Sequence, residues 1–227
     1  FYYGVPWGSL VVLSFVLFVY MFVLDGRTDP YNPVSIPYRA WSYFYPLGMV
    51  TAPFSHASQG HLIGNLLGAA LVAPIAEYAW GHYPNGHESG DGRWQNPRLR
   101  AFVIFPATVL AVGLLTSLFA LGPVIGFSGV VYAFAGFAIV RYPLPTLVAA
   151  TLGSGAMRSI YNAINQPITV YTARPRAPSA PSWAEVAIQA HALGFFIGFV
   201  LAIVLFRRRG VDADPLHIEP GRQGHVF

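Results

Sequence analysis

Four polar side chains within apolar stretches of the sequence are of the types that carry out nucleophilic catalysis. Ser128 lies in a Gly-Phe-Ser-Gly stretch, and His191 lies about two turns into a later apolar run. A serine hydroxyl can attack a carbonyl carbon when an imidazole accepts its proton. His61 and Asn65 are spaced i and i+4 at the start of another apolar run, 61–78. Both could donate hydrogen bonds to a developing oxyanion. The residue types therefore predict a Ser128–His191 dyad with nearby oxyanion donors.

The acidic residues favour a dyad over a triad. Glu77 lies at the far end of the apolar run that starts at His61, and Glu185 lies six residues before His191, on a different helix face. The aspartates outside the apolar runs are Asp25, Asp29, Asp91, Asp212 and Asp214. We therefore expect no carboxylate to orient the His191 ring.

The composition places these residues in a membrane protein. Of the 227 residues, 55% are hydrophobic and only 10% are charged, whereas a soluble domain carries roughly 25% charged residues. The absence of cysteine excludes disulfides, thiol nucleophiles and cysteine-ligated metal sites. All basic residues are arginines, and they are too scattered for a nucleic-acid-binding stripe.

Six apolar runs predict an all-α membrane protein with six transmembrane helices, since one crossing takes about 20 residues. The runs are 8–24, 61–78, 101–121, 126–140, 144–164 and 183–206. We interpret the first as a helix and not a signal peptide, because no basic segment precedes it and no small-residue cleavage site follows it. Residues 1–206 are predicted to form one membrane domain and residues 207–227 a cytoplasmic tail. Between the spans we expect an aromatic-rich patch at 41–45 and a solvated loop at 81–100.

The predicted topology brings the polar residues to one depth. The second, fourth and sixth spans cross in the same direction, and His61, Ser128 and His191 all lie near the starts of these spans. Because the side of both termini holds more arginines, the positive-inside rule predicts cytoplasmic termini in the cell membrane. The polar group would then lie in the outer half of the bilayer.

Small residues predict that the fourth and sixth spans pack closely, since they let helix backbones approach in a membrane. The stripe on the fourth span is Gly129, Ala133 and Gly136, and the stripe on the sixth is Gly194, Gly198 and Ala202. Tyr132 lies one turn beyond Ser128 and on the same helix face. Close packing would let Ser128 and His191 form a hydrogen bond.

These segments resemble the motifs of the rhomboid family of intramembrane serine proteases. The segment 126–132 resembles the family's nucleophile motif, in which a tyrosine four residues after the serine packs on the catalytic histidine. Segment 61–65 resembles its HxxxN oxyanion motif, and segment 190–198 resembles its AHxxGxxxG motif. The sequence departs from the family at Arg39-Ala40-Trp41, where the family's Trp-Arg order is reversed, and at Gln59-Gly60, which replaces an apolar pair.

The resemblance implies a six-helix rhomboid-like bundle over about residues 8–206 that hydrolyses peptide bonds in or next to transmembrane segments, without metal or cofactor. Ser128 and His191 would be catalytic, and His61, Asn65 and the Ser128 N–H would bind the oxyanion. The supporting residues would be Tyr132, Gly126, Gly129, His56, Gly194 and Gly198. The implied partners are transmembrane protein substrates and membrane lipids and not nucleic acid, while the sequence leaves the oligomeric state open.

Other interpretations of the same residues stay open. A non-catalytic rhomboid-like protein would bind transmembrane helices without cutting them. A proton-coupled transporter would use intramembrane histidines as a relay, although no carboxylate lies in the middle of a span. The polar cluster His82, His87, Glu88 and Asp91 could hold a metal, but it lacks helical spacing and is typical of a solvated loop.

Overall fold

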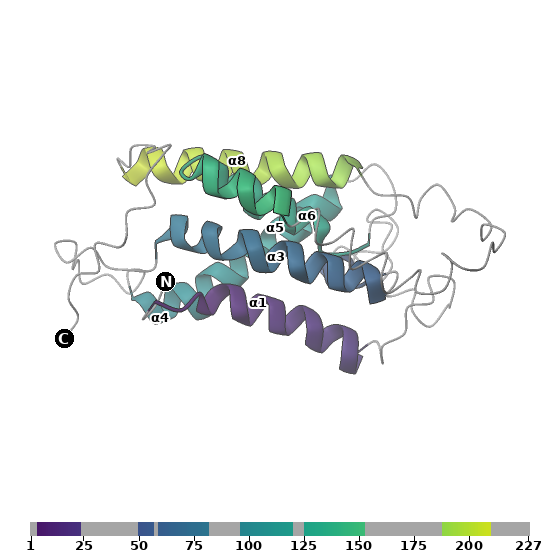
Figure 1. Cartoon of the computed structure of the whole chain (residues 1–227). Coiled ribbons are helices and arrows are strands. Elements are labelled where there is room, and N and C mark those ends of the chain that lie inside the picture. The colour runs from purple at the N-terminus through teal and green to yellow at the C-terminus, as the bar shows by residue number, and fades with distance from the viewer. Residues whose placement is uncertain are drawn as a thin grey trace.

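The computed structural model describes residues 4–23, 50–56, 59–81, 96–119, 125–152 and 188–209, and its regular elements there are helices that form a bundle (Figure 1). Helix α1 is Trp7–Phe18, continued by a π-helical turn at Val19–Val23, and a 3-10 turn follows at Ala52–Phe54. Helix α3 is Gln59–Trp80. Helix α4, Pro97–Leu99, leads through a π-helical turn at Arg100–Ile104 into α5, Phe105–Leu118. The remaining helices are α6 (Ser128–Ile139), Pro143–Leu152 and α8 (Ile188–Arg209).

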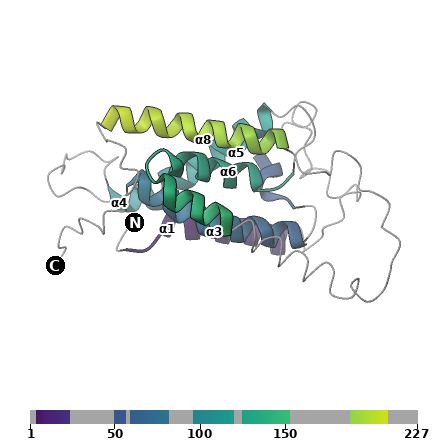
Figure 2. The ribbon, with the colours of Figure 1, turned by 45° about the horizontal axis from the view of Figure 1, so that its top comes forward.

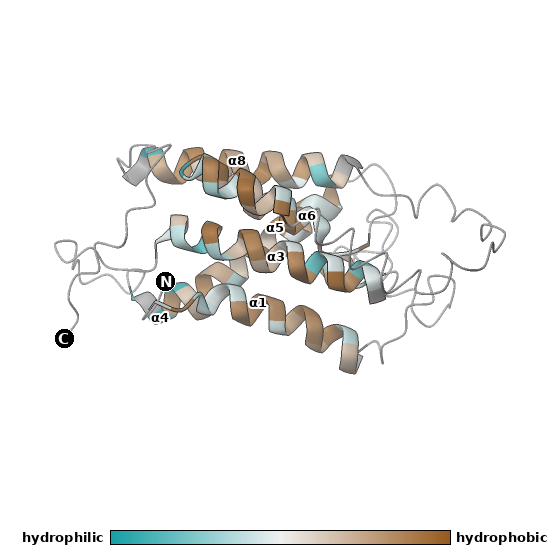
Figure 3. Ribbon diagram, in the orientation of Figure 1, coloured by the Kyte–Doolittle hydropathy of each residue, from teal (hydrophilic) through white to brown (hydrophobic). Residues whose placement is uncertain are grey.

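The chain is an all-α membrane bundle, as the apolar runs predicted. Within the described ranges, Gly60–Trp80, Arg100–Leu118 and Ala190–Arg207 are long and apolar enough to cross a bilayer. The apolar helices Trp7–Phe22, Ser128–Ile139 and Pro143–Leu152 are shorter. Large apolar side chains point outward from the bundle, and Phe196 is 63% exposed. Such an apolar exterior suits a lipid environment, and Figure 3 shows that apolar residues make up most of the length of the long helices.

The third apolar span is Arg100–Leu118, close to the predicted 101–121, but the helix that contains it begins four residues before the predicted start. Its helix begins at Pro97, inside the stretch predicted to be loop, because the Asn96 side chain caps it. The Asn96 Oδ1 atom accepts hydrogen bonds from the backbone N–H of Arg98 at 2.9 Å and of Leu99 at 3.4 Å. The helix ends at Leu118 and not at residue 121. The last helix also extends beyond its predicted end at residue 206, to Arg209.

Helices α3 and α6 run in the same direction. Near their starts, the Gly126 backbone lies against the His61 side chain. Near their ends, the rings of Trp80 and Phe137 lie 5.8 Å apart between centroids. The polar residues at the starts of both helices therefore lie at the same end of the bundle.

Helices α6 and α8 are also parallel, and they lie side by side in both views of the bundle (Figures 1 and 2). A Cβ atom on Gly194 would overlap the carbonyl oxygen of Gly129, and one on Gly198 would overlap that of Ala133. The two backbones thus touch at successive turns. This contact confirms the close packing that the two stripes of small residues predicted.

Helix α5 runs opposite to α6. The rings of Phe105 and Phe134 stack with centroids 5.8 Å apart, whereas Thr116, near the other end of α5, faces Gly129 at the start of α6. The end of α5 therefore lies beside the start of α6. This order places the polar residues Thr116 and Ser117 near Ser128.

The buried carboxylate of Glu77 joins α3 to the start of α1. Glu77 is 0% exposed, and its oxygens accept hydrogen bonds from the backbone N–H groups of Gly8 at 2.9 Å and Ser9 at 2.6 Å. The Ser9 hydroxyl adds a third hydrogen bond at 2.7 Å. A carboxylate is favourable at a helix N-terminus because unpaired N–H groups and the helix dipole both stabilise its charge. Helix α1 is consequently antiparallel to α3.

Several predicted features lie outside the described residues. They are the aromatic patch 41–45, the Arg39-Ala40-Trp41 segment, the cluster from His82 to Asp91, the fifth span beyond Leu152, residues 183–187 and the tail from residue 210.

Candidate active site

The segment before α6 is held against α3 by Gly126. The φ angle of Gly126 is +108°, a conformation that L side chains rarely adopt. A Cβ atom there would overlap the His61 ring and would lie 3.3 Å from the Asn65 side-chain nitrogen. The Gly126 N–H also donates a 2.9 Å hydrogen bond to the Ala52 carbonyl. Only glycine satisfies both the backbone angle and this approach, and α6 then begins with Ser128.

His61 and Asn65 lie on the face of α3 that looks toward Gly126. Asn65 is 2% exposed, and its amide nitrogen has no hydrogen-bond partner among the described residues. A buried N–H donor without an acceptor is costly. The Asn65 amide is therefore available to an oxygen atom that enters this place.

The ring of His191 stacks on the ring of Tyr132. Their centroids are 4.3 Å apart and the ring planes differ by 14°. His191 lies near the start of α8 and is also near enough to His61 for an electrostatic interaction. The resemblance of segment 126–132 implied that Tyr132 would pack on the histidine, and the stacked pair shows this contact.

Ser128 and His191 lie on helices whose backbones touch close to both residues. The contact between Gly129 and Gly194 is one residue after Ser128 and three residues after His191. Both side chains are half-buried. No hydrogen bond between them is formed within the described residues, so the predicted bond is not present in this structure.

A small cavity of about 20 Å³, partly open to solvent, lies next to Ser128. The walls come from the start of α6, the end of α5, the Ala52 segment and Ala190 of α8. Thr116 and Ser117 of α5 are among the lining residues, and sequence reasoning did not select them. Their signal was two adjacent hydroxyls in an apolar run, at the end of the run that leads to Ser128.

His56 lies beside His61 with the two rings edge to face, 5.2 Å apart between centroids. It is 3% exposed, and neither ring nitrogen has a hydrogen-bond partner among the described residues. The pKa of His56 is lowered from 6.5 to about 3, mainly by burial and secondly by the nearby His61, with the Phe54 backbone opposing in part. His56 is therefore neutral at physiological pH.

A metal ion has no evident site among the described residues. No group of three or more His, Cys, Asp or Glu side chains comes together there. Glu77 is the single acidic side chain of the described ranges, and it binds the start of α1. The candidate site thus consists of neutral hydrogen-bonding groups around a serine and histidines.

The comparison with protein families agrees with this arrangement. A family model described as the Rhomboid domain matches residues 41–208, which is most of the chain. The chain belongs to the rhomboid family. The match covers α3, α5, α6 and α8, and so it includes every element that contributes to the candidate site. Comparisons with curated proteins and with solved structures found no match.

Proposed function

We propose that this rhomboid-family protein is an intramembrane serine endopeptidase that hydrolyses peptide bonds in or next to the transmembrane segments of its substrates. One observation carries the proposal. The starts of three parallel helices, distant in sequence, bring together the His61 and Asn65 pair, Ser128, and the His191 ring stacked on Tyr132. Hydrophilic positions near the starts of α3 and α8 stand out in otherwise apolar helices (Figure 3), and a polar residue in a membrane needs a partner or a task.

In the proposed mechanism, the Ser128 hydroxyl attacks the scissile carbonyl carbon while His191 accepts its proton. His191 then gives that proton to the leaving amine, and an acyl-enzyme remains on Ser128. Water hydrolyses the acyl-enzyme with His191 again as the base. The hydrogen bond between Ser128 and His191 has to form in the substrate complex, and catalytic hydrogen bonds in unliganded enzymes are often long before substrate binds.

The oxyanion would be held by groups that already face the start of α6. The Asn65 amide supplies an unpaired buried donor, and the Ser128 N–H lies at a helix N-terminus. His61 lies against Gly126, two residues before the nucleophile. Loss of one oxyanion donor typically costs about 3 to 4 kcal/mol of transition-state stabilisation.

We propose that both termini lie in the cytoplasm and that the site lies in the outer half of the cell membrane. The described arginine side chains Arg98, Arg100, Arg141 and Arg207 support this orientation, because they lie at the end of the bundle opposite to Ser128. The positive-inside rule assigns such an end to the cytoplasm.

A second candidate function is binding of transmembrane helices without cleavage. It is favoured by the missing hydrogen bond between Ser128 and His191 within the described residues. A binding protein of this kind would have a serine of ordinary reactivity.

The test is labelling of the purified chain by a fluorophosphonate probe, together with cleavage of a reporter transmembrane substrate in vesicles. We expect Ser128→Ala to abolish both labelling and cleavage. The matched control is Ser14→Ala, which changes an exposed serine of α1 and should leave both unchanged. Unreduced cleavage by Ser128→Ala would refute the mechanism, and substrate binding without labelling of the wild type would favour the second candidate.

A further inference from the structure

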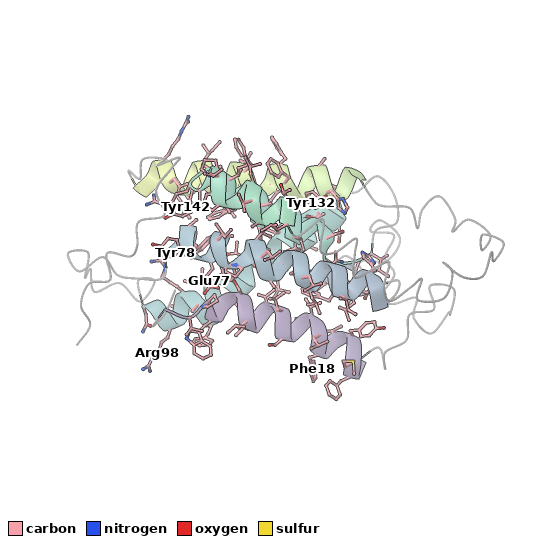
Figure 4. The ribbon with its side chains drawn as sticks, in the orientation of Figure 1. Phe18, Glu77, Tyr78, Arg98, Tyr132 and Tyr142 are labelled. Atoms are coloured by element: carbon pink, nitrogen blue, oxygen red, sulfur yellow. The ribbon has the colours of Figure 1, made fainter. Side chains whose placement is uncertain are left out.

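The charged side chains of the described residues are distributed unevenly. Arg98, Arg100, Arg141 and Arg207 all lie at the end of the bundle where α3 and α8 finish, which we call the arginine end. Figure 4 shows Arg98, Tyr78 and Tyr142 at this end and Phe18 at the other. Glu77 is the single carboxylate of the described ranges, and it is buried against Gly8 and Ser9. The described arginines are therefore concentrated at one end of the bundle.

Arg141 is held by two aromatic rings and one phenol hydroxyl. Its guanidinium carbon lies 5.5 Å from the centre of the Tyr142 ring and 5.9 Å from the centre of the Phe206 ring. The Nε atom donates a 3.1 Å hydrogen bond to the Tyr142 hydroxyl. The Tyr142 ring in turn packs against Tyr78 at 5.6 Å. Aromatic contacts orient a guanidinium while leaving its hydrogen-bonding edge open.

The terminal amino groups of Arg141 form no hydrogen bond with any residue that the structure describes. Arg207 is exposed and directly follows Phe206, whose ring Arg141 covers. A planar guanidinium with free N–H groups matches the oxygens of a phosphate in a bidentate geometry. This place is therefore suited to an anion that carries a phosphate group.

Apolar side chains next to Arg141 and Arg207 indicate what is attached to that phosphate. Leu144 and Leu147 follow Arg141 on the next helix and are each 53% exposed, and Val204 precedes Arg207 by three residues and is 44% exposed. Exposed apolar side chains therefore lie within a few residues of both arginines along the chain. An acyl chain could lie on these side chains while the headgroup phosphate contacts the arginines, whereas free phosphate would leave them unused.

We propose that Arg141, held on Tyr142 and Phe206 and assisted by Arg207, binds the headgroup phosphate of an anionic phospholipid. The site lies at the opposite end of α6 from Ser128 and does not depend on the proposed protease activity. It differs from general attraction to an acidic membrane surface, because one oriented guanidinium dominates it.

The experiment is native mass spectrometry of the full chain in detergent, titrated with phosphatidylglycerol or phosphatidylcholine. We expect the wild type to retain phosphatidylglycerol preferentially and Arg141→Gln to weaken its apparent affinity about fivefold, because this variant lacks the oriented guanidinium; a fivefold change corresponds to about 1 kcal/mol. Arg98→Gln is the matched control, because it removes an exposed arginine from the same end of the bundle, and it should retain the wild-type affinity. Arg141→Lys keeps the positive charge but lacks the planar guanidinium, so it should bind phosphatidylglycerol with intermediate affinity. This variant also tests the proposal if Arg141→Gln does not fold.

Three results would overturn the proposal. Equal retention of the two lipids by the wild type would exclude a site for anionic lipid. If Arg98→Gln lost as much affinity for phosphatidylglycerol as Arg141→Gln or Arg141→Lys, the lipid would be held by diffuse charge attraction. Displacement of bound phosphatidylglycerol by millimolar inorganic phosphate would assign the arginines to free phosphate and not to a lipid.

Discussion

At the scale of single residues, the stacked rings of Tyr132 and His191 offer a test that separates ring packing from the phenol hydroxyl. Tyr132→Phe keeps the stack, so kcat/KM for a reporter substrate should stay close to the wild type. Tyr132→Ala removes it, and kcat/KM should fall about tenfold, because an aromatic pair contributes about 0.5 to 1.5 kcal/mol. An equal fall in kcat/KM in the two variants would show that the Tyr132 hydroxyl, and not the ring stack, supports catalysis.

His56 gives a prediction for stability against pH. Its pKa is lowered from 6.5 to about 3 in the folded chain, so between these values the unfolded chain takes up a proton that the folded chain does not. The stability that neutral His56 provides is therefore complete above pH 6.5 and is lost as the pH falls toward about 3. Thermal unfolding in detergent should show a falling midpoint over this window.

The control for that measurement is His56→Asn, which removes the titrating group. We expect a shallower dependence of the unfolding midpoint on pH in this variant. If the unfolding midpoint fell equally steeply with pH in the wild type and in the variant, groups other than His56 would take up the proton.

Much of the candidate site could be predicted from residue types and spacing. His61, Asn65, Ser128 and His191 were selected because polar groups near the starts of apolar helices need a task, and the structure gathers them. The positive φ of Gly126 was not predictable, because glycine is common in loops for many reasons. The rotamers of Ser128 and His191 depend on the packing of whole helices and are not encoded in local spacing.

At the scale of helices, the link from α3 to α1 rests on one carboxylate. Glu77→Leu would leave the N–H groups of Gly8 and Ser9 and the Ser9 hydroxyl without their acceptor. We expect the free energy of unfolding to fall by about 3 kcal/mol, since each buried unpaired group costs about 1 to 3 kcal/mol. Glu77→Gln keeps one acceptor oxygen and should lose less. The measurement is thermal or denaturant unfolding in detergent, and an unchanged stability of Glu77→Leu would contradict this role.

Helix positions and directions were largely predictable, because apolar length and small-residue stripes report directly on crossing and close packing. Contacts at Gly194 and Gly198 confirm the closest of these packings. The start of α4 was missed although Asn96 followed by Pro97 is typical of a helix beginning. The polar composition of the preceding segment obscured that signal. The π-helical turns at Val19–Val23 and Arg100–Ile104 have no local sequence signature.

At the scale of the whole molecule, the two ends of the bundle differ in chemistry. One end holds neutral polar groups around Ser128. The other is the arginine end, which also carries aromatic side chains. Composition alone predicted a membrane protein, and the scarcity of charge follows from the lack of water in the bilayer core. Which arginine is fixed on aromatic rings could not be predicted, because Tyr142 and Phe206 are distant in sequence and meet only through the packing of α6 with α8.

The 12 residues of α6 span only about 18 Å at 1.5 Å per residue, far less than a hydrocarbon core of about 30 Å. Its neighbours α3 and α8 have 22 residues each and are long enough to reach both faces of the bilayer. The start of α6 would then lie at the bottom of a recess between longer helices and not at the membrane surface.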